Sequence, residues 1–278
     1  MRLPLFSRST SIGFATMGAQ IEARHRRCER WWAPHVRNTR EFLAQQVPPG
    51  LRVGVLGAGR LIDVDADGLL ERSREVHLID ADPGCRSVWR AVGSAQQRKK
   101  LVARTEDVTD CIISWSRQIA SVGGRSKLAA GLSALRAPRP AWADERFDLI
   151  VSLNLLGQIP LYWRDFVRST YAALSEHEEE QLAVSMGELQ AAHLRALFGS
   201  VAHRVILIFD SEYYFYEASR AEWRVESALF GAATDALRAG AGSRALQGSD
   251  TWLWHLAPQF VEQEDEGEIH KVEALAFG

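Results

Sequence analysis

An apolar run that ends in two glycines constrains the fold of this chain more than any other feature. Residues 53–59 read V-G-V-L-G-A-G, and the next apolar run, at 76–79, ends in Asp80. A short helix is predicted between the two runs, from Asp65 to Arg72, with Asp65 as its N-cap. A strand, a glycine turn, a helix and an acid-ended strand together predict a parallel βαβ unit.

The same residues predict a nucleotide-binding turn. Glycines after the first strand let backbone approach a ligand closely, and Asp80 lies where an acid can accept hydrogen bonds from a ribose. The alternative is an ordinary tight turn between two buried strands, with Asp80 capping the turn that follows. The rest of the chain favours the first interpretation, because the strand–turn–helix order is the one that such sites need.

Buried strands alternate with helices along the rest of the chain. Strands are predicted at 101–103, 147–152, 204–210, 251–256 and 269–277, and helices at 84–93, 110–120, 162–174, 178–198 and 218–239. This alternation is typical of an α/β protein with a Rossmann-like, doubly wound and mostly parallel sheet. No helix separates the last two strands, so we expect them to form an antiparallel hairpin at a sheet edge.

The N-terminal part has a different pattern. Residues 1–50 are interpreted as a helical extension and candidate lid, and 51–278 as the Rossmann-like domain. Pro34 is expected to split the extension into two helical pieces. Residues 25–32, H-R-R-C-E-R-W-W, leave two interpretations open. They form either a lid helix over the pocket or a solvated charged face with one of the two tryptophans docked on the core.

Composition and charge exclude several classes of protein. Hydrophobic residues make up 46% and charged residues 24%, which predicts a packed core, and the net charge of -2 gives no overall attraction to nucleic acid or membrane surfaces. No run of about 18 apolar residues occurs, and Pro4 and Arg8 interrupt any signal sequence. We therefore expect a soluble, cytoplasmic protein without nucleic-acid or membrane partners, and we leave a homodimer open.

Several types of catalytic site lack their motifs. The three cysteines are far apart without a C-x-x-C pair, so neither a disulfide framework nor a cysteine zinc site is expected. The eight histidines show no H-x-x-x-H or H-E-x-x-H spacing, so no metal is expected. A G-x-S-x-G elbow and a P-loop are absent as well, which argues against those hydrolases and P-loop NTPases.

Four segments in order resemble the class I S-adenosylmethionine-dependent methyltransferases. They are V-G-V-L-G-A-G at 53–59, H-L-I-D-A-D-P at 77–83, T-E-D-V at 105–108 and F-D-L-I-V-S-L-N-L-L at 147–156. The resemblance runs from about residue 51 to residue 210 and includes the C-terminal hairpin. The family often has a third glycine at the position of Leu61, where this chain departs from it. The resemblance implies S-adenosylmethionine as cofactor and methyl transfer to an acceptor, which we expect to be a small molecule.

The resemblance also implies cofactor contacts for particular residues. Gly57 and Gly59 would approach the methionine part of S-adenosylmethionine, and Asp80 would hold the ribose hydroxyls. Asp107, or Glu106 in its place, would contact the adenine amino group.

Four further residues are candidates at the rim of the sheet. Asp63 either contacts the cofactor's ammonium group, directly or through water, or makes only local hydrogen bonds in its turn. Asn154 would line the site beside the reactive methyl and align the acceptor, unless it simply satisfies loop backbone. Asp210 is the candidate base at the end of the following strand, with Glu212 as the alternative.

Two other functions remain open on the sequence alone. A nicotinamide-dependent oxidoreductase is disfavoured, because Ile62 occupies the third glycine position of the dinucleotide motif. A methyltransferase-like domain that binds a ligand or partner without catalysis fits the absence of an obvious base.

Overall fold

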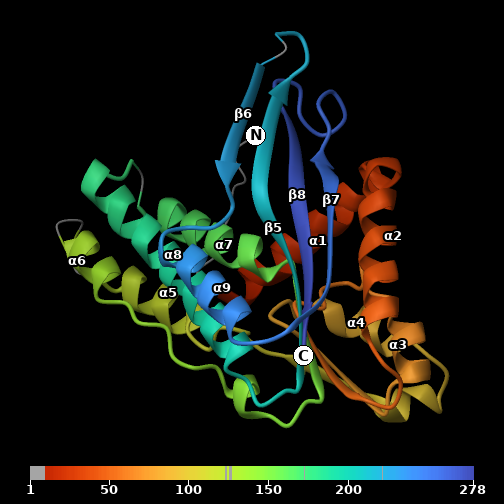
Figure 1. Cartoon of the computed structure of the whole chain (residues 1–278). Coiled ribbons are helices and arrows are strands. Elements are labelled where there is room, and N and C mark those ends of the chain that lie inside the picture. The colour runs from red at the N-terminus through yellow and green to blue at the C-terminus, as the bar shows by residue number, and fades with distance from the viewer. Residues whose placement is uncertain (1–9, 123, 125–126, 172, 221) are drawn as a thin grey trace.

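The computed structural model describes residues 10–122, 124, 127–171, 173–220 and 222–278. Within them eight strands form one sheet, in the order β3-β2-β1-β4-β5-β8-β7, with β6 paired to β5 beside this path (Figure 1). The strands are β1 (Arg52–Leu56), β2 (Glu75–Asp80), β3 (Leu101–Thr105), β4 (Leu149–Leu153), β5 (Arg204–Glu217), β6 (Glu222–Ser227), β7 (Leu246–Ala257) and β8 (Gly267–Phe277).

The helices are α1 (Thr10–Arg27), α2 (Glu29–Gln46), α3 (Ala66–Arg72), α4 (Cys85–Ala91), α5 (Ile112–Ala120), α6 (Leu128–Ser133), α7 (Leu155–Thr170), α8 (Glu176–Phe198) and α9 (Ala232–Gly242). Two short 3-10 helices, η1 (Gln97–Lys100) and η3 (Ala141–Asp144), complete the described elements. None of these helices is long and apolar enough to cross a bilayer.

The sheet confirms the predicted α/β fold. Strands β1 to β5 pair in parallel, and the order reverses between β1 and β4, which are neighbours. Strand β8 is antiparallel to both β5 and β7, so the last two strands form the expected hairpin with β7 at the edge. Ligands in such sheets bind outside the carboxyl ends of the strands at the point of reversal, which here lies between β1 and β4.

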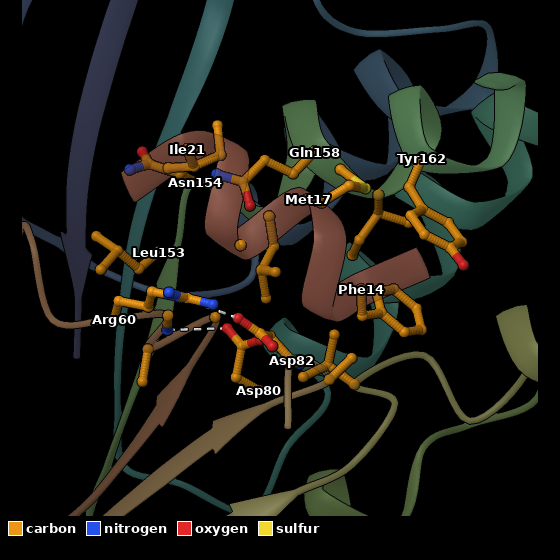
Figure 2. A pocket seen from close by; sticks show the side chains of 18 of the residues that line it. Phe14, Met17, Ile21, Arg60, Asp80, Asp82, Leu153, Asn154, Gln158 and Tyr162 are labelled. Carbon is orange, nitrogen blue, oxygen red and sulfur yellow. Dashed lines mark hydrogen bonds and ion pairs between the residues drawn. The ribbon is translucent and has the colours of Figure 1, made fainter. Parts of the chain in front are cut away.

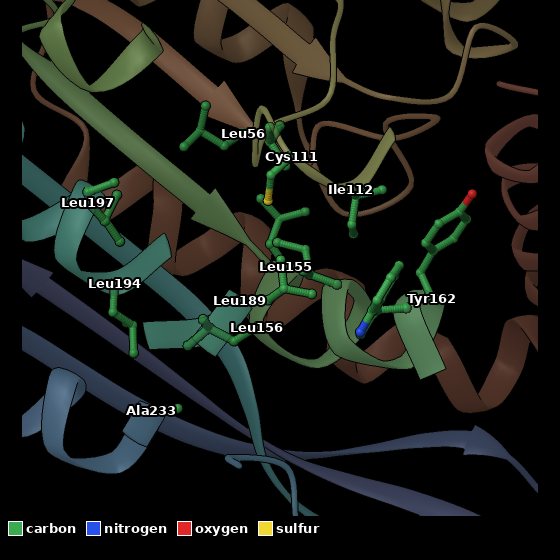
Figure 3. Packing of buried hydrophobic residues seen from close by; sticks show 14 of the residues in the cluster. Leu56, Cys111, Ile112, Leu155, Leu156, Tyr162, Leu189, Leu194, Leu197 and Ala233 are labelled. Atoms are coloured by element: carbon green, nitrogen blue, oxygen red, sulfur yellow. The ribbon is translucent and has the colours of Figure 1, made fainter. Parts of the chain in front are cut away.

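Helices cover both faces of the sheet and enclose a core on each (Figure 1). One core is built largely from α5, α7 and α8, and Figure 3 shows Leu155, Leu156 and Leu189 meeting in it. The other core takes Trp32 from α2 and Trp89 from α4, and both side chains are buried. Helix α2 therefore packs on the sheet as part of the domain. The N-terminal helices form part of the wall around the carboxyl edge of the sheet.

Two predicted boundaries of helices are wrong. The chain breaks at Cys28, between α1 and α2, and the expected break at Pro34 is absent because Pro34 lies inside α2. Helix α7 begins at Leu155 and contains Pro160, whose missing N–H leaves the Leu156 carbonyl without its helical donor. Gln190 Nε2 donates to that carbonyl at 2.6 Å, which explains how α7 keeps its proline.

The predicted helix at 218–239 is also wrong in its first half. Strand β6 occupies Glu222–Ser227 and pairs antiparallel with the far end of β5, and α9 begins only at Ala232. Apolar Trp223 and Val225 alternate with charged residues there, which is the strand period. Strand β5 is twice the expected length, and this extension supplies the partner that β6 needs. Between the predicted helix at 110–120 and the predicted strand at 147–152, residues 123, 125 and 126 lie outside the described residues.

Candidate functional site

A pocket lies at the carboxyl ends of β1, β2, β3 and β4, under helix α1 (Figure 2). Its lining combines apolar side chains with acids. The lining residues are Phe14, Met17, Gly18, Ile21, Trp32, Gly57, Ala58, Gly59, Arg60, Ile62, Asp63, Asp80, Ala81, Asp82, Asp107, Val108, Thr109, Ile112, Leu153, Asn154, Leu155, Gln158, Ile159, Tyr162 and Trp254. Six of the seven predicted site residues are among them, and Asp210 is not.

The glycine turn fits tightly between β1 and β4. Gly57 has φ +73° and Gly59 has φ +50°, a left-handed region that side chains disfavour. A Cβ on Gly57 would lie 2.7 Å from the Leu153 carbonyl oxygen, so only glycine fits there. Leu61 also has a positive φ, of 60°. The position where the family often has a third glycine therefore keeps the conformation that a glycine would favour, although a leucine occupies it.

The N–H groups of the turn are already bonded within the chain. Those of Gly57 and Ala58 donate to the Ile79 carbonyl, at 2.9 and 3.3 Å, and that of Leu61 donates to the Ala58 carbonyl at 3.2 Å. The Gly59 N–H donates to the Asp80 carboxylate at 2.8 Å. These four donors are consequently not free for a ligand's phosphate groups.

Asp80 ends β2 and connects it to the glycine turn. Its Oδ2 accepts the Gly59 N–H and its Oδ1 accepts the Asp82 N–H, both at 2.8 Å. Burial raises the pKa of the Asp80 carboxyl, while these hydrogen bonds oppose that rise. The carboxylate is held by backbone on both oxygens and faces the pocket with its remaining lone pairs, which suits an acceptor for a diol.

Asp107 and Asn154 follow β3 and β4. Asp107 Oδ1 accepts the Thr109 N–H at 3.0 Å and its Oδ2 accepts the Ile113 N–H at 3.1 Å, so the carboxylate is fixed at the start of α5. Glu106, the alternative, does not line the pocket and instead pairs with Arg104 at 2.7 Å. Asn154 has a left-handed φ of 53° as the N-cap of α7, and its buried Oδ1 has no hydrogen-bond partner among the described residues.

Asp63 follows Gly59 by four positions and contacts two other elements. Its Oδ2 accepts a hydrogen bond from Asn154 Nδ2 at 2.9 Å and lies 3.5 Å from His35 Nε2 of α2. The predicted cofactor residue and the predicted aligning residue are therefore joined directly, over 91 positions of sequence.

Helix α1 forms the wall opposite the sheet. Gly18 packs so close to Asp82 that a Cβ on it would meet the Asp82 carboxylate at 1.9 Å. Arg60, directly after the glycine turn, pairs with Asp82 at 3.3 Å and with Glu22 of α1. Figure 2 shows Arg60 beside Asp80 and Asp82, below the helix.

A second set of ion pairs holds the end of α1. Arg24 and Arg27 both pair with Glu262, from the connection between β7 and β8, at 3.0 and 2.7 Å. The wall of the pocket is thus attached to the rest of the fold by side-chain charges at two places, one beside the glycine turn and one at the C-terminal hairpin.

Asp210 belongs to a buried cluster behind Gly157 of α7. Its Oδ2 lies 3.1 Å from His270 Nδ1, and His270 Nε2 lies 2.8 Å from Glu268. Burial lowers the pKa of His270, but the two carboxylates outweigh it and raise that pKa to about 9. Asp210 Oδ1 and the Tyr213 hydroxyl are buried without hydrogen-bond partners among the described residues.

The candidate lid predicted at residues 1–50 includes α1, the helix that closes the pocket, but sequence reasoning named none of its lining residues. The narrower lid left open at residues 25–32 supplies Trp32 to the lining, whereas Phe14, Met17, Gly18 and Ile21 come from α1. Their helical spacing is a signal that could have been found, because it puts apolar side chains on one face. In the assigned segment Trp32 is buried and docks on the core, which confirms that interpretation for this residue.

Comparisons with known proteins were made with the whole chain. No family model matches it, and no curated protein matches it. Among solved structures, it is similar to an S-adenosylmethionine-dependent methyltransferase from Mesorhizobium loti, at 13% identity, with 84% of this chain and 95% of that chain covered and a TM-score of 0.39. It is also similar to magnesium protoporphyrin IX methyltransferase from Synechocystis PCC 6803, with bound SAM, at 13% identity, 96% and 94% coverage and a TM-score of 0.40.

The topology agrees with the resemblance seen in the sequence. The glycine turn after β1, the acid that ends β2, the parallel strands and the antiparallel β7–β8 hairpin all occupy the expected places. The chain therefore has a Rossmann-like α/β fold with a mostly parallel sheet. In this fold, β6 and the far half of β5 form an extension beyond the parallel strands (Figure 1).

Proposed function

We propose that this protein binds S-adenosylmethionine and transfers its methyl group to a small-molecule acceptor. The charge of the pocket carries the proposal. Among the described lining residues, four carry carboxylates, namely Asp63, Asp80, Asp82 and Asp107, and Arg60 alone is basic. Because Arg60 is paired with Asp82, the pocket favours a ligand with positive charge and hydrogen-bond donors.

S-adenosylmethionine has both properties, whereas a dinucleotide has hydrogen-bond donors but carries an anionic pyrophosphate. Its sulfonium and ammonium are cations, while its ribose and adenine present hydroxyl and amino donors. A nicotinamide dinucleotide needs free N–H groups for its pyrophosphate. The turn N–H groups of Gly57, Ala58, Gly59 and Leu61 are already bonded here, and the nearby carboxylates would repel phosphate. This difference favours the methyl donor over the oxidoreductase alternative.

The residues present fit this cofactor. Asp80, fixed by two backbone hydrogen bonds, would hold the ribose hydroxyls, and Asp107 would accept from the adenine amino group. Gly59 leaves room for the methionine part, since a Cβ there would have no neighbour closer than 3.9 Å, and Gly57 would approach the same part with its backbone. Bound there, S-adenosylmethionine would supply an electrophilic methyl on a good leaving group.

The acceptor would lie between that methyl and α1. Phe14 of α1 stacks on Tyr162 of α7 at a centroid distance of 4.3 Å, and Met17 lies beside them (Figure 2). These side chains give an apolar, enclosed surface, which suits a small molecule more than a polymer. The unpartnered Asn154 Oδ1 would accept a hydrogen bond from the acceptor and so align it.

We further propose that Asp210 acts as the base for an acceptor that must lose a proton. Its Oδ2 is engaged by His270, so Oδ1 is the atom that would take the proton. The carboxylate packs against Gly157, where a Cβ would lie 2.7 Å from Asp210 Oδ2, and Gly157 directly precedes Gln158, which lines the pocket.

Calorimetry and thermal shift test the cofactor. We expect S-adenosylhomocysteine to raise the free energy of unfolding by about 2.7 kcal/mol at 100 times its Kd, because it binds only the folded chain. NAD at the same concentration should give no shift. A folded protein that shows neither heat nor thermal shift with S-adenosylhomocysteine and S-adenosylmethionine would rule the proposal out.

Two substitutions test the acceptor side. Asn154→Ala and Asp210→Asn are expected to lower turnover, the second by about 10²- to 10⁴-fold, which is the usual contribution of a general base. In Asp210→Asn the cofactor affinity should stay within about threefold, since Asp210 is not assigned to cofactor contacts. Asn154→Ala also removes the hydrogen bond to Asp63 Oδ2, so a rise in the cofactor Kd is expected for that variant. Transfer of labelled methyl to metabolites from the source's extract supplies the assay, and Glu212→Gln is the control beside Asp210. Loss of cofactor binding together with turnover in Asp210→Asn would contradict the assignment of Asp210 to the acceptor side.

A further inference from the structure

His35 of α2 has a fixed hydrogen-bonding arrangement. Its side chain is 0% exposed, and its Nδ1 lies 3.0 Å from Trp252 Nε1 of β7. An indole N–H can only donate, so Nδ1 must be the acceptor and the imidazole proton must be on Nε2. Trp252 therefore selects one neutral tautomer of His35.

The protonated Nε2 of His35 points at the pocket carboxylate. It lies 3.5 Å from Asp63 Oδ2 and has no hydrogen-bond partner among the described residues. A buried donor without an acceptor is unfavourable, so closer approach of Asp63 to His35 is favoured. Catalytic hydrogen bonds are often long in a free protein and shorten when the ligand binds.

The imidazole itself cannot move to find another acceptor. Its ring stacks on Trp254 at a centroid distance of 4.1 Å with an interplanar angle of 9°. Trp254 in turn packs edge-on against Trp32. Helix α2 and strand β7 thus form a rigid support, and Asp63 is the part of the contact that can adjust.

Both polar contacts of Asp63 fall on the same oxygen. His35 Nε2 and Asn154 Nδ2 approach Oδ2, which leaves Oδ1 for a ligand in the pocket that Asp63 lines. We propose that His35 is a positioning residue, which holds Asp63 so that its Oδ1 accepts the ammonium group of S-adenosylmethionine. This role rests on the proposed function, because it assumes that the pocket binds this cofactor.

The affinities of two ligands distinguish a positioning role of His35 from a purely structural one. S-adenosylhomocysteine carries the amino-acid ammonium, and 5′-methylthioadenosine lacks it but keeps the adenosine part. For His35→Phe, which retains a ring against Trp254, we expect the Kd of S-adenosylhomocysteine to rise about tenfold or more. The Kd of 5′-methylthioadenosine should stay within about twofold, because its contacts lie at Asp80 and Asp107.

Calorimetry on the full chain gives four informative results. Asp63→Asn should show the same split between the two ligands, and it keeps the proposal testable if His35→Phe does not fold. His177→Phe, at an exposed position on α8, should change neither Kd. Equal weakening of both ligands, or unchanged affinity for both, overturns the role of His35. A wild-type protein that binds neither ligand overturns the proposed function itself and this role with it.

Discussion

Asp80→Ala is expected to weaken S-adenosylhomocysteine binding by about 1–3 kcal/mol while the protein stays folded. The substitution removes the carboxylate that would accept the ribose hydroxyls. It also removes the acceptors of the Gly59 and Asp82 N–H groups, which fix the glycine turn relative to β2. Calorimetric titration measures the loss, and circular dichroism checks the fold.

Asp80→Asn keeps the size of the side chain but does not keep its hydrogen bonds. Each oxygen of Asp80 accepts one backbone N–H, so Asp80→Asn would turn an amide donor toward a backbone donor. We therefore expect Asp80→Asn to weaken binding about as much as Asp80→Ala. Asp235→Asn, at an exposed position on α9, is the control. Unchanged affinity in both Asp80 variants would show that Asp80 is only a turn residue.

Gly57→Ala is expected to lower the free energy of unfolding by roughly 2–5 kcal/mol. A left-handed φ costs a side chain roughly 1–2 kcal/mol, and forcing a methyl into a packed site adds typically 1–3 kcal/mol. At Gly57 the φ is +73° and the new Cβ would lie 2.7 Å from both the Leu153 carbonyl oxygen and Leu155 Cγ. Urea unfolding measures the difference.

Gly50→Ala provides a matched control for the turn. Gly50 has a similar φ of +81°, but a Cβ there would have no neighbour within 4 Å. Its substitution should therefore cost only the backbone term, and the difference between the two variants isolates the contact with β4. If both variants lose the same free energy, the close packing of the turn against β4 is not a source of stability.

The parts of the fold that follow from local pattern were predictable. Residues 53–56 form an apolar run that ends in a glycine turn, and residues 76–79, apolar except for His77, end in an acid. The two strands, and the edge of the sheet at which they end, therefore follow from the sequence. Asp63, Asp80, Asp107 and Asn154 were therefore placed at one edge, and all four line one pocket. Their individual roles remain predictions.

The parts that depend on distant contacts were not predictable. Helix α7 keeps Pro160 because Gln190, from α8, replaces the lost donor to Leu156. Strand β6 exists because β5 runs on beyond the parallel strands and offers it an edge. The contact between His35 and Trp252 spans 217 positions of sequence. No local periodicity encodes such pairs, so sequence reasoning could name residues but not their partners.

The contacts that hold α1 in place affect the rates at which ligands enter and leave the pocket. The helix is the pocket's outer wall, and its charged contacts are the pairs of Glu22 with Arg60 and of Arg24 and Arg27 with Glu262. Partly exposed ion pairs contribute about 0–1 kcal/mol each and weaken with salt. These pairs are the part of the attachment of α1 that salt weakens, so we expect the residence time of a bound molecule to depend on this helix and on ionic strength.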